Sequence, residues 1–491
     1  MLGAFFNKSL SGQSTFLSKI GIPFEKIIYK ISGIDEKKDM DWKEYFKAML
    51  AFNIVGFLFV FFVLMFQAQL PLNPAGLPNL SWHLALNTAI SFMTNTNWQS
   101  YVGEATMSHF SQMVALAGQN FFSAASGLAI LLVLIRAFRN NQSKLLGNFW
   151  VDLNRSLIYV LLPLSIVWAV ALAGQGVIQN FSEPIKVTTL EGKEQLISQG
   201  PVASQIAIKQ LGTNGGGFFN TNSAHPFENP SPLSNFLELL ALILIPAALT
   251  LTFGYMLNKP REGWILFAAM LIVLVGGLAI SLWSEYQPNA LTANHFPMEG
   301  KEVRFGVTNS ILWSTFTTAA SNGSVNAMHS SLTPIAGGVA MLNMLFGEII
   351  FGGVGSGLYG MLLYVVLTVF IAGLMVGRTP EYLGKKIEAF DIKMAIIGIL
   401  TPSFVILFGT AFSLITPSIM SSLMHKGPHG FSEIFYAFTS ATGNNGSAFA
   451  GLSANTPILN TLLGGAMLFG RFVVILPVMA LAGNISGKKI M

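Results

Sequence analysis

The sequence predicts an all-α, polytopic membrane protein made of four repeats, each with a membrane span, a short helix and a second span. Three observations predict it. Hydrophobic residues make up 52% of the 491 residues and charged residues only 10%, against about 25% charged in soluble domains. Uncharged stretches such as that between Lys47 and Glu104 exceed the roughly 20 apolar residues that cross a bilayer as a helix. Four short runs of small polar residues also recur at similar intervals.

The composition excludes several classes of protein. Without cysteine, the chain has no thiolate nucleophile, cysteine-ligated zinc or iron–sulfur cluster. Its hydrophobic content excludes a disordered chain, a disulfide scaffold and an ordinary cytosolic enzyme. The net charge of +5 is no indication of nucleic-acid binding.

Eight stretches are predicted to span the membrane. They lie near residues 47–69, 113–138, 157–179, 234–257, 263–284, 341–376, 393–417 and 456–483. The sixth stretch is too long for one straight helix and contains FGGVGSG at 351–357. Glycine destabilises a helix interior by about 1 kcal/mol relative to alanine, so we expect two half-helices around an unwound loop.

Basic residues gather on one side of this predicted topology. Of the 27 Lys and Arg residues, 20 fall in the N-terminal segment, in the loops after the second, fourth and sixth spans, and in the C-terminal tail. The positive-inside rule places that side in the cytoplasm. Residues 1–46 are Lys-rich, too polar to span and without a signal-peptide pattern. We therefore expect a cytoplasmic N-terminal segment at 1–46 and a cytoplasmic tail at 484–491.

A shorter apolar segment lies between the two spans of each pair and ends in a small-polar run. The runs are TNTNWQS (94–100), GTNGGGFFN (212–220), SNGSVNAM (321–328) and TGNNGSAF (442–449). We align them on Asn97, Asn214, Asn322 and Asn445. The alignment predicts repeats at 47–138, 157–257, 263–376 (with the broken second span) and 393–483, whose short pore helices surround a pseudo-fourfold pore.

The four runs also predict a ligand. Irregular backbone at membrane depth is tolerated only where it is buried in protein or lines water. Backbone carbonyls, hydroxyls and Asn amides from four such turns would replace the hydration shell of a cation. The absence of carboxylates favours a large monovalent ion such as K⁺ over Ca²⁺ or Mg²⁺. The alternative is that these are ordinary loops, which fits one turn well but fits four at regular spacing poorly.

Several long segments resemble one known family. They are NTAISFMTNTNWQSYVGE (87–104), GTNGGGFFNTNSAHPFENP (212–230), EIIFGGVGSGLYGM (348–361), GRTPEYLGKK (377–386) and NNGSAFAGLSANTP (444–457). From about Asp41 to Lys489 the chain is similar to the potassium-binding subunits of Kdp-type potassium-transporting ATPases. The resemblance implies a channel-like subunit of the Trk/Ktr/HKT superfamily within a P-type ATPase complex. In that family, K⁺ is selected at a filter and passes through a tunnel to a separate ATP-hydrolysing subunit.

The resemblance also implies the residues of the selectivity filter. They are Thr96, Asn97, Trp98, Gln99, Asn214, Gly215, Gly216, Ser321, Asn322, Gly323, Asn444, Asn445 and Gly446. Two features depart from the family pattern. The family usually has a further apolar span before the first repeat and another after the fourth, and Asn322 stands where a smaller or less polar residue is expected.

Arg471 is a lone charge in the last predicted span, with Glu348 beside the broken span as its expected partner. An ionisable group inside the membrane is costly and indicates a function. The resemblance places Arg471 below the filter, where its charge blocks straight conduction. The glycines expected to gate or couple are Gly352, Gly353, Gly355 and Gly357. The alternatives are a snorkelling arginine or structural ion pair, and glycines that only allow close helix packing.

Other candidate sites are weak. His225 and Glu228 suggest a metal pair, but the prolines of HPFENP prevent a regular helix and no third ligand is evident. We therefore expect no resident metal. Glu104, Glu228 and Glu433 are expected to attract cations to the pore entrance. GTNGGGFFN lacks the lysine of a P-loop, so we expect neither an ATP site nor catalytic residues.

We therefore predict a non-catalytic subunit that binds extracellular K⁺ and passes it to an ATP-hydrolysing subunit, in a bacterial plasma-membrane complex. The implied partners are KdpB-like, KdpC-like and KdpF-like subunits and membrane lipid, and K⁺ is the only bound ion expected. One alternative is a stand-alone potassium channel or symporter of the same superfamily. Alternatives from other classes are an intramembrane enzyme and a non-conducting scaffold.

Overall fold

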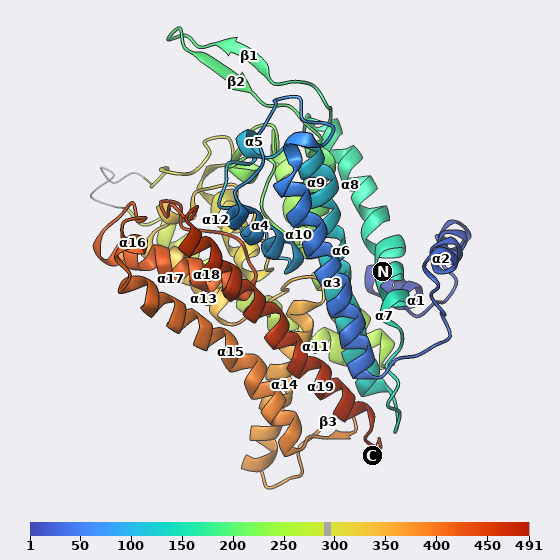
Figure 1. The fold of residues 1–491 in the computed structure, drawn as a ribbon. Coiled ribbons are helices and arrows are strands. Elements are labelled where there is room, and N and C mark those ends of the chain that lie inside the picture. The colour runs from blue at the N-terminus through green and yellow to red at the C-terminus, as the bar shows by residue number, and fades with distance from the viewer. Residues whose placement is uncertain (289–295, 491) are drawn as a thin grey trace.

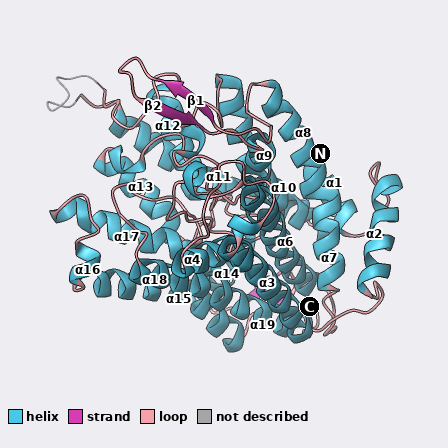
Figure 2. Cartoon of the chain, turned by 45° about the horizontal axis from the view of Figure 1, so that its top comes forward, coloured by secondary structure: helices cyan, strands magenta, loops and turns pink. Residues whose placement is uncertain are grey.

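The computed structural model describes residues 1–288 and 296–490, and most of its regular structure is helical (Figure 1, Figure 2). Eight of its helical segments are long and apolar enough to cross a membrane. They are α3 (Trp42–Met65), η2 with α6 (Ser111–Ala117, Gly118–Arg139), α7 with η3 and α8 (Phe149–Arg155, Ser156–Leu161, Leu162–Gly174), α10 (Pro232–Met256), α11 (Pro260–Glu285), α14 (Ser356–Met375), α15 (Ala389–Leu414), and α18 with η7 and α19 (Pro457–Leu468, Phe469–Val473, Val474–Ser486). Each overlaps one of the eight predicted spans.

Polar caps fix where several of these spans begin. The side chain of Asp41 accepts hydrogen bonds from the backbone of Lys43 and Glu44, and Glu44 bonds back to Asp41 to complete a capping box at α3. Ser231 caps α10 and Thr456 caps α18 in similar ways, each just before a proline. A polar cap followed by a proline is a strong signal for a helix start. The apolar run that follows then has to continue as helix, because backbone groups in lipid have no water to bond.

The sixth predicted span is broken, as expected. Helix α13 covers Pro334–Leu345, α14 begins at Ser356, and residues 346–355 between them are not helical. Only α14 qualifies as a span by itself. The break places an irregular loop deep inside the protein, since Ile350, Phe351 and Val354 are all buried.

A short helix precedes each small-polar run, which confirms that part of the prediction. The four are α4 (Trp82–Met93), α9 (Val202–Leu211), α12 (Gly306–Ala319) and α17 (Gly427–Gly443). Each packs against the span that comes before it, namely α3, α8, α11 and α15. All four therefore end at the runs that the sequence singled out.

The central span is α6. Its segment is 83% buried, against 22% for α11, so α11 presents most of its apolar side chains outward, as contact with lipid requires. Near the N-terminus, α1 (Leu2–Leu10) packs on α10 with Phe6 and Leu10 fully buried. Helix α2 (Ser18–Ser32) follows it at the edge of the molecule (Figure 1). Neither helix was predicted from the sequence.

Two small hairpins were also not predicted. Strands β1 (Ile185–Thr188) and β2 (Glu194–Ile197) pair antiparallel between α8 and α9 and project from the helical body (Figure 1). Strands β3 (Glu381–Tyr382) and β4 (Lys385–Lys386) pair after α14. The remaining short elements are η1 (Gln67–Gln69), α5 (Gly103–Thr106), η4 (Asn222–Ala224), η6 (His329–Ser331) and α16 (Pro417–Met420).

A buried ionic group ties three of the helices together. Asp152 of α7 binds both terminal nitrogens of Arg136 of α6, at 2.5 and 2.6 Å, and accepts a hydrogen bond of 2.8 Å from Tyr45 of α3. Asp152 and Tyr45 are buried. Removing one partner of such a group leaves the other charge uncompensated in a low-dielectric environment.

We expect Asp152→Asn to lower the free energy of unfolding by about 3–5 kcal/mol, measured in detergent by denaturant titration with tryptophan fluorescence. Lys386→Gln is the matched control, because its 3.8 Å pair with Glu388 is about half exposed and such pairs contribute less than about 1 kcal/mol. Equal losses in the two variants would contradict a structural role for Asp152.

Candidate ion-binding site

The four short helices end in turns with one repeated backbone pattern. In each turn a backbone N–H bonds to the carbonyl five residues earlier: Thr96 to Ser91 (2.9 Å), Asn214 to Lys209 (2.9 Å), Asn322 to Thr317 (3.1 Å) and Asn445 to Ser440 (2.9 Å). A left-handed residue comes before each donor: Asn95, Thr213, Ser321 and Asn444, with φ from 48° to 65°. Another follows it: Asn97, Gly215, Gly323 and Gly446, with φ from 56° to 100°. These bonds make Thr96, Asn214, Asn322 and Asn445 structurally equivalent.

This equivalence corrects the sequence alignment by one residue in the first turn. Asn97 does not correspond to Asn214, because Thr96 occupies that place. Asn97 instead holds the left-handed position, φ 56°, that glycine holds in the other three turns. Asparagine is one of the few residues besides glycine that adopt this conformation readily.

The turns contact one another in a closed ring. A Cβ atom added at Gly215 would overlap the carbonyl oxygen of Asn322, and one at Gly323 would overlap that of Asn445. A Cβ at Gly446 would likewise overlap the carbonyl oxygen of Thr96. The ring closes through Asn97, whose Nδ2 donates to the carbonyl oxygen of Gly215 at 3.4 Å. In the second, third and fourth turns, glycine is therefore required both by its positive φ and by the close approach of the neighbouring backbone.

Four carbonyl groups in this ring have no protein partner. Thr96, Asn214, Asn322 and Asn445 are each 0% exposed, and no hydrogen bond found within residues 1–288 and 296–490 ends on their carbonyl oxygens. Buried carbonyls are almost always bonded to protein or water. We call these four groups the carbonyl ring. Four equivalent exceptions at one place indicate a ligand rather than a packing defect.

Side chains from the same turns brace the ring. Asn322 donates through Nδ2 to the carbonyl of Lys209 at 3.2 Å, and Asn445 donates to that of Thr317 at 2.9 Å. Asn444 Nδ2 donates to Thr96 Oγ1 at 2.9 Å, and Ser321 Oγ donates to the Asn444 carbonyl at 3.0 Å. These amide nitrogens are occupied in holding the neighbouring turns, and the carbonyl oxygens of the ring remain without a hydrogen bond from the described residues.

Three other sequence-predicted filter residues support the turns. The carbonyl oxygen of Trp98 accepts from Ser91 Oγ at 3.0 Å, and that of Gly216 accepts from Lys209 Nζ at 2.9 Å. Gln99 exchanges two hydrogen bonds with the backbone of Gly217, at 2.9 and 3.1 Å. The structure thus brings these residues to the ring, with the carbonyls of Trp98 and Gly216 already bonded.

Lys209 was not predicted from the sequence to be part of this site. Its ammonium group is fully buried and bonds to Glu228 Oε2 at 2.7 Å as well as to the Gly216 carbonyl. Thr317 makes the equivalent bond in the third turn, from Oγ1 to the Ser324 carbonyl at 2.7 Å. A lone lysine inside an apolar segment, just before GTNGGG, was the available signal.

Lys209 also changes the interpretation of HPFENP. Glu228, expected at the entrance, is fully buried and accepts from Lys209 and from the backbone N–H of Phe219 at 2.8 Å. His225 stacks on Phe219 with ring centroids 3.8 Å apart. Burial, and to a smaller extent the nearby charge of Arg304, lowers the pKa of His225 to about 4. The two residues therefore shape this loop and do not form a metal pair.

The entrance carboxylates also differ from expectation. Glu104 of α5 accepts a 2.8 Å hydrogen bond from the backbone of Asn220, and burial raises the pKa of Glu104 above its usual range. Glu433 is fully buried and bonded to His425. Of the three predicted entrance carboxylates, only Glu104 is partly exposed.

Two cavities lie on opposite sides of the carbonyl ring. One of about 800 Å³ is lined by Gln99, Gly216, Gly323 and Gly446. Another of about 70 Å³ is lined by Ser321, Asn444, Glu348 and Arg471. Gly323 and Gly446 follow the ring residues Asn322 and Asn445, whereas Ser321 and Asn444 precede them. The ring therefore separates a wide cavity from a narrow one.

Glu348 and Arg471 share the narrow cavity but do not form the predicted ion pair. No nitrogen–oxygen distance of 4 Å or less joins them, although both residues are described and buried. Arg471 lies in η7, a π-helical turn, where Nη2 donates to the Ser123 carbonyl at 3.4 Å. Within the described part of the chain, both carboxylate oxygens of Glu348 are buried without a hydrogen-bond partner.

The loop that contains Gly352, Gly353, Gly355 and Gly357, which we call the glycine loop, lies against the narrow side of the carbonyl ring. The backbone N–H of Val354 donates to Thr213 Oγ1 at 2.8 Å, and a Cβ at Gly353 would lie 3.5 Å from the side chain of Ser321. Gly355 has φ 83°, and a Cβ there would overlap the Gly127 carbonyl oxygen. Gly352 and Gly357 pack directly against each other. The loop thus touches the second and third turns at the residues just before the ring.

Comparisons with known proteins show the family of the chain. Residues 1–491 match the family model KdpA, described as the potassium-transporting ATPase A subunit. The potassium-binding subunits of the potassium-transporting ATPases of Pseudomonas aeruginosa and Rhodospirillum centenum are each 54% identical, over 99% and 100% of this chain and 87% and 86% of theirs. That of Leptospira interrogans is 55% identical over 95% of this chain and 84% of its own.

One solved structure shows the same fold. The potassium transporter TrkH from Vibrio parahaemolyticus aligns with a TM-score of 0.56 at 15% identity, covering 96% of this chain and 94% of its own. At that identity the likeness concerns the fold alone. The family match over the full length confirms the resemblance of the motifs, and the chain belongs to the KdpA family, the A subunits of potassium-transporting ATPases.

Proposed function

We propose that the carbonyl ring is the selectivity filter of a pseudo-fourfold pore and that K⁺ enters it from the wide cavity. Below the ring, Arg471, Glu348 and the glycine loop direct the ion sideways to a separate ATP-hydrolysing subunit. The observation that carries the proposal is the set of four equivalent, fully buried carbonyls without a protein partner, at Thr96, Asn214, Asn322 and Asn445.

The chemistry of the ring suits K⁺. Its four carbonyl oxygens are neutral ligands, and no carboxylate belongs to the ring. Neutral carbonyls replace the water of a weakly hydrated monovalent cation, whereas Ca²⁺ and Mg²⁺ recruit Asp or Glu. Helices α4, α9, α12 and α17 all end at the ring, so the negative ends of four helix dipoles add to its attraction for a cation.

The repeat boundaries follow from the same reasoning. Each proposed unit, at 47–138, 157–257, 263–376 and 393–483, contributes one short helix and one turn. The wide cavity faces outward in the proposed orientation, because the basic loops lie toward the other side. The relatives named above are bacterial, which supports a plasma membrane as the location.

Arg471 supplies the proposed barrier. The narrow cavity of about 70 Å³ holds little water, so a cation that leaves the ring meets the guanidinium charge with little screening. Glu348 and the glycine loop border the same cavity, and their arrangement opens a sideways route in the proposal. The energy for uphill transport comes from a KdpB-like subunit, with KdpC-like and KdpF-like subunits completing the complex.

We expect Gly323→Ala to raise the K⁺ concentration for half-maximal uptake by about tenfold or more, because the added Cβ displaces the Asn445 carbonyl. This change corresponds to a loss of at least about 1.4 kcal/mol in the free energy of K⁺ binding. Rubidium uptake by cells without other potassium systems measures it. Gly338→Ala in α13 is the control, since a Cβ there meets no atom within 4 Å. An unchanged half-maximal concentration in correctly inserted Gly323→Ala protein would remove this turn from the filter.

Arg471→Gln removes the proposed barrier, so we expect it to increase passive rubidium flux through proteoliposomes in the absence of ATP. Arg471→Lys keeps the positive charge and should remain as closed as the unmodified chain. If passive rubidium flux through the Arg471→Gln protein did not increase, Arg471 would have a structural role only.

The dependence on partners distinguishes a pump subunit from a stand-alone channel or symporter. We expect uptake at micromolar external potassium only when this chain is expressed with its cognate ATPase subunits, and none when their ATP hydrolysis is abolished. Uptake by the chain alone, driven by membrane potential or a cation gradient, would favour the stand-alone alternative.

A further inference from the structure

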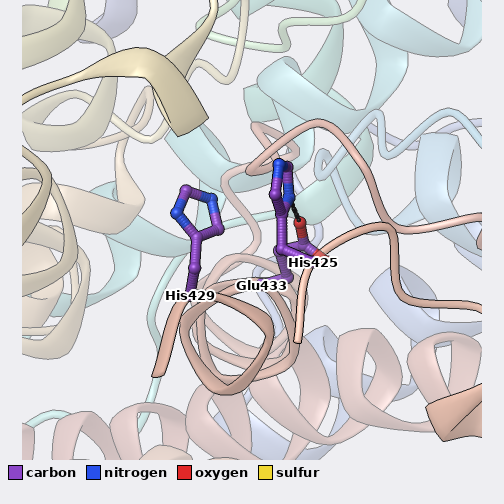
Figure 3. A group of neighbouring side chains, drawn as sticks. All are labelled: His425, His429 and Glu433. Carbon is purple, nitrogen blue, oxygen red and sulfur yellow. Dashed lines mark hydrogen bonds and ion pairs between the residues drawn. The ribbon is translucent and has the colours of Figure 1, made fainter. Parts of the chain in front are cut away.

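Three potential metal ligands converge away from the carbonyl ring. His425, His429 and Glu433 each offer one ligand atom, and these atoms lie within 4.8 Å of one another. In Figure 3 the imidazole of His425 lies over the carboxylate of Glu433, and that of His429 lies beside them. His425 bonds to the carboxylate through Nδ1 at 2.6 Å. The two imidazole centroids are 4.3 Å apart. We call these three residues the His–His–Glu cluster.

The fold places these side chains together through regular structure. His429 and Glu433 are four residues apart on α17 and so share one face of that helix. His425 lies in the preceding loop, which is held by backbone bonds from Met424 to Gly451 (3.1 Å) and from Ser453 to Ser422 (2.8 Å). The cluster therefore does not depend on a chance approach of mobile side chains.

Glu433 carries the second observation. Its side chain is fully buried, and its Oε2 atom has no hydrogen-bond partner in the described structure. A buried carboxylate oxygen without a partner is costly unless it binds a cation. Neither imidazole is buried, and both border a cavity of about 910 Å³ that is also lined by Glu299. An ion can thus reach the two imidazoles from this cavity, and the carboxylate of Glu433 lies beside them.

We propose that the His–His–Glu cluster is a binding site for a divalent transition metal ion, with Zn²⁺ as the best fit. Two imidazole nitrogens and one carboxylate oxygen are a common three-ligand set for zinc, and water fills the remaining position. Imidazole also suits Cu²⁺ and Ni²⁺, whereas Ca²⁺ and Mg²⁺ prefer all-oxygen sites. The sequence signal is His-x-x-x-His-x-x-x-Glu in HKGPHGFSE, although only His225 and Glu228 were considered as metal ligands from the sequence.

This site is separate from the potassium path. Its cavity and the wide cavity above the ring share only the segment Ala450–Ser453, which lies between them. None of the three side chains contributes to the carbonyl ring. Substitution of the histidines should therefore weaken metal binding and leave potassium uptake intact, so the test of this site does not depend on the filter.

The test uses the full chain, purified in detergent with its cognate subunits and without a polyhistidine tag. Titration with Co²⁺, a spectroscopic substitute for Zn²⁺, should give visible ligand-field bands from nitrogen and oxygen ligands. Equilibrium dialysis should show one Zn²⁺ ion bound per chain, and this Zn²⁺ should displace bound Co²⁺. The double variant His425→Gln/His429→Gln should lose the bands and bind Zn²⁺ at least tenfold more weakly.

His83→Gln is the matched control, because His83 is another partly exposed histidine and lies outside the cluster, bonded to Asn460. It should bind Zn²⁺ as the unmodified chain does. Potassium uptake by the double variant shows that it is folded. No bound Zn²⁺ in the unmodified chain, or equal binding by the double variant and the unmodified chain, would overturn the proposal.

Discussion

Irregular backbone deep within a membrane protein has to find partners for its polar groups, and the rest of this structure depends on how four turns meet that requirement. In each turn one backbone N–H bonds five residues back to the end of a short helix. Asparagine amides and serine hydroxyls bond the neighbouring turns. After this bracing, the buried carbonyl oxygens of Thr96, Asn214, Asn322 and Asn445 accept no hydrogen bond from the described residues. These equivalent oxygens are the ones we propose as ligands of the ion.

The chain is not symmetric in charge around that ring. The second turn is braced by the ammonium group of Lys209, where the first and third use the hydroxyls of Ser91 and Thr317. Glu228 neutralises Lys209 at 2.7 Å, so the ring itself remains close to neutral. On the narrow side, Arg471 and Glu348 share a cavity without pairing. The charge of Lys209 is therefore compensated beside the ring, whereas the guanidinium of Arg471 faces the narrow cavity without an ion pair to Glu348 and is free to act as the proposed barrier.

Hydropathy and composition predicted the coarse architecture well. The eight spans, the break at FGGVGSG and the helix before each turn all depend on long apolar runs, glycine content and local caps, and these are local properties. The register of the first turn was wrong because Asn97 and Asn214 look alike in sequence, whereas backbone φ shows that Asn97 takes the place of a glycine. A one-letter pattern does not distinguish an asparagine that adopts φ > 0 from one that braces a neighbour.

Properties that depend on tertiary distance were not predictable. The pairing of Lys209 with Glu228 joins residues on either side of a loop, and the expected pair of Arg471 with Glu348 fails because the two side chains do not approach within 4 Å. Glu433 was expected to attract cations at the pore entrance, yet it is fully buried and bonded to His425. Burial and partner choice are set by how the spans pack, which no single segment specifies.

The most direct test of the central claim is to locate an ion. Thallium(I) substitutes for K⁺ and scatters anomalously, so crystals of the assembled complex grown with Tl⁺ would reveal its position. We predict an anomalous peak coordinated by the carbonyl oxygens of Thr96, Asn214, Asn322 and Asn445, which K⁺ competes away and Na⁺ does not. A Tl⁺ site elsewhere in the chain, with these four carbonyls empty, would contradict the account.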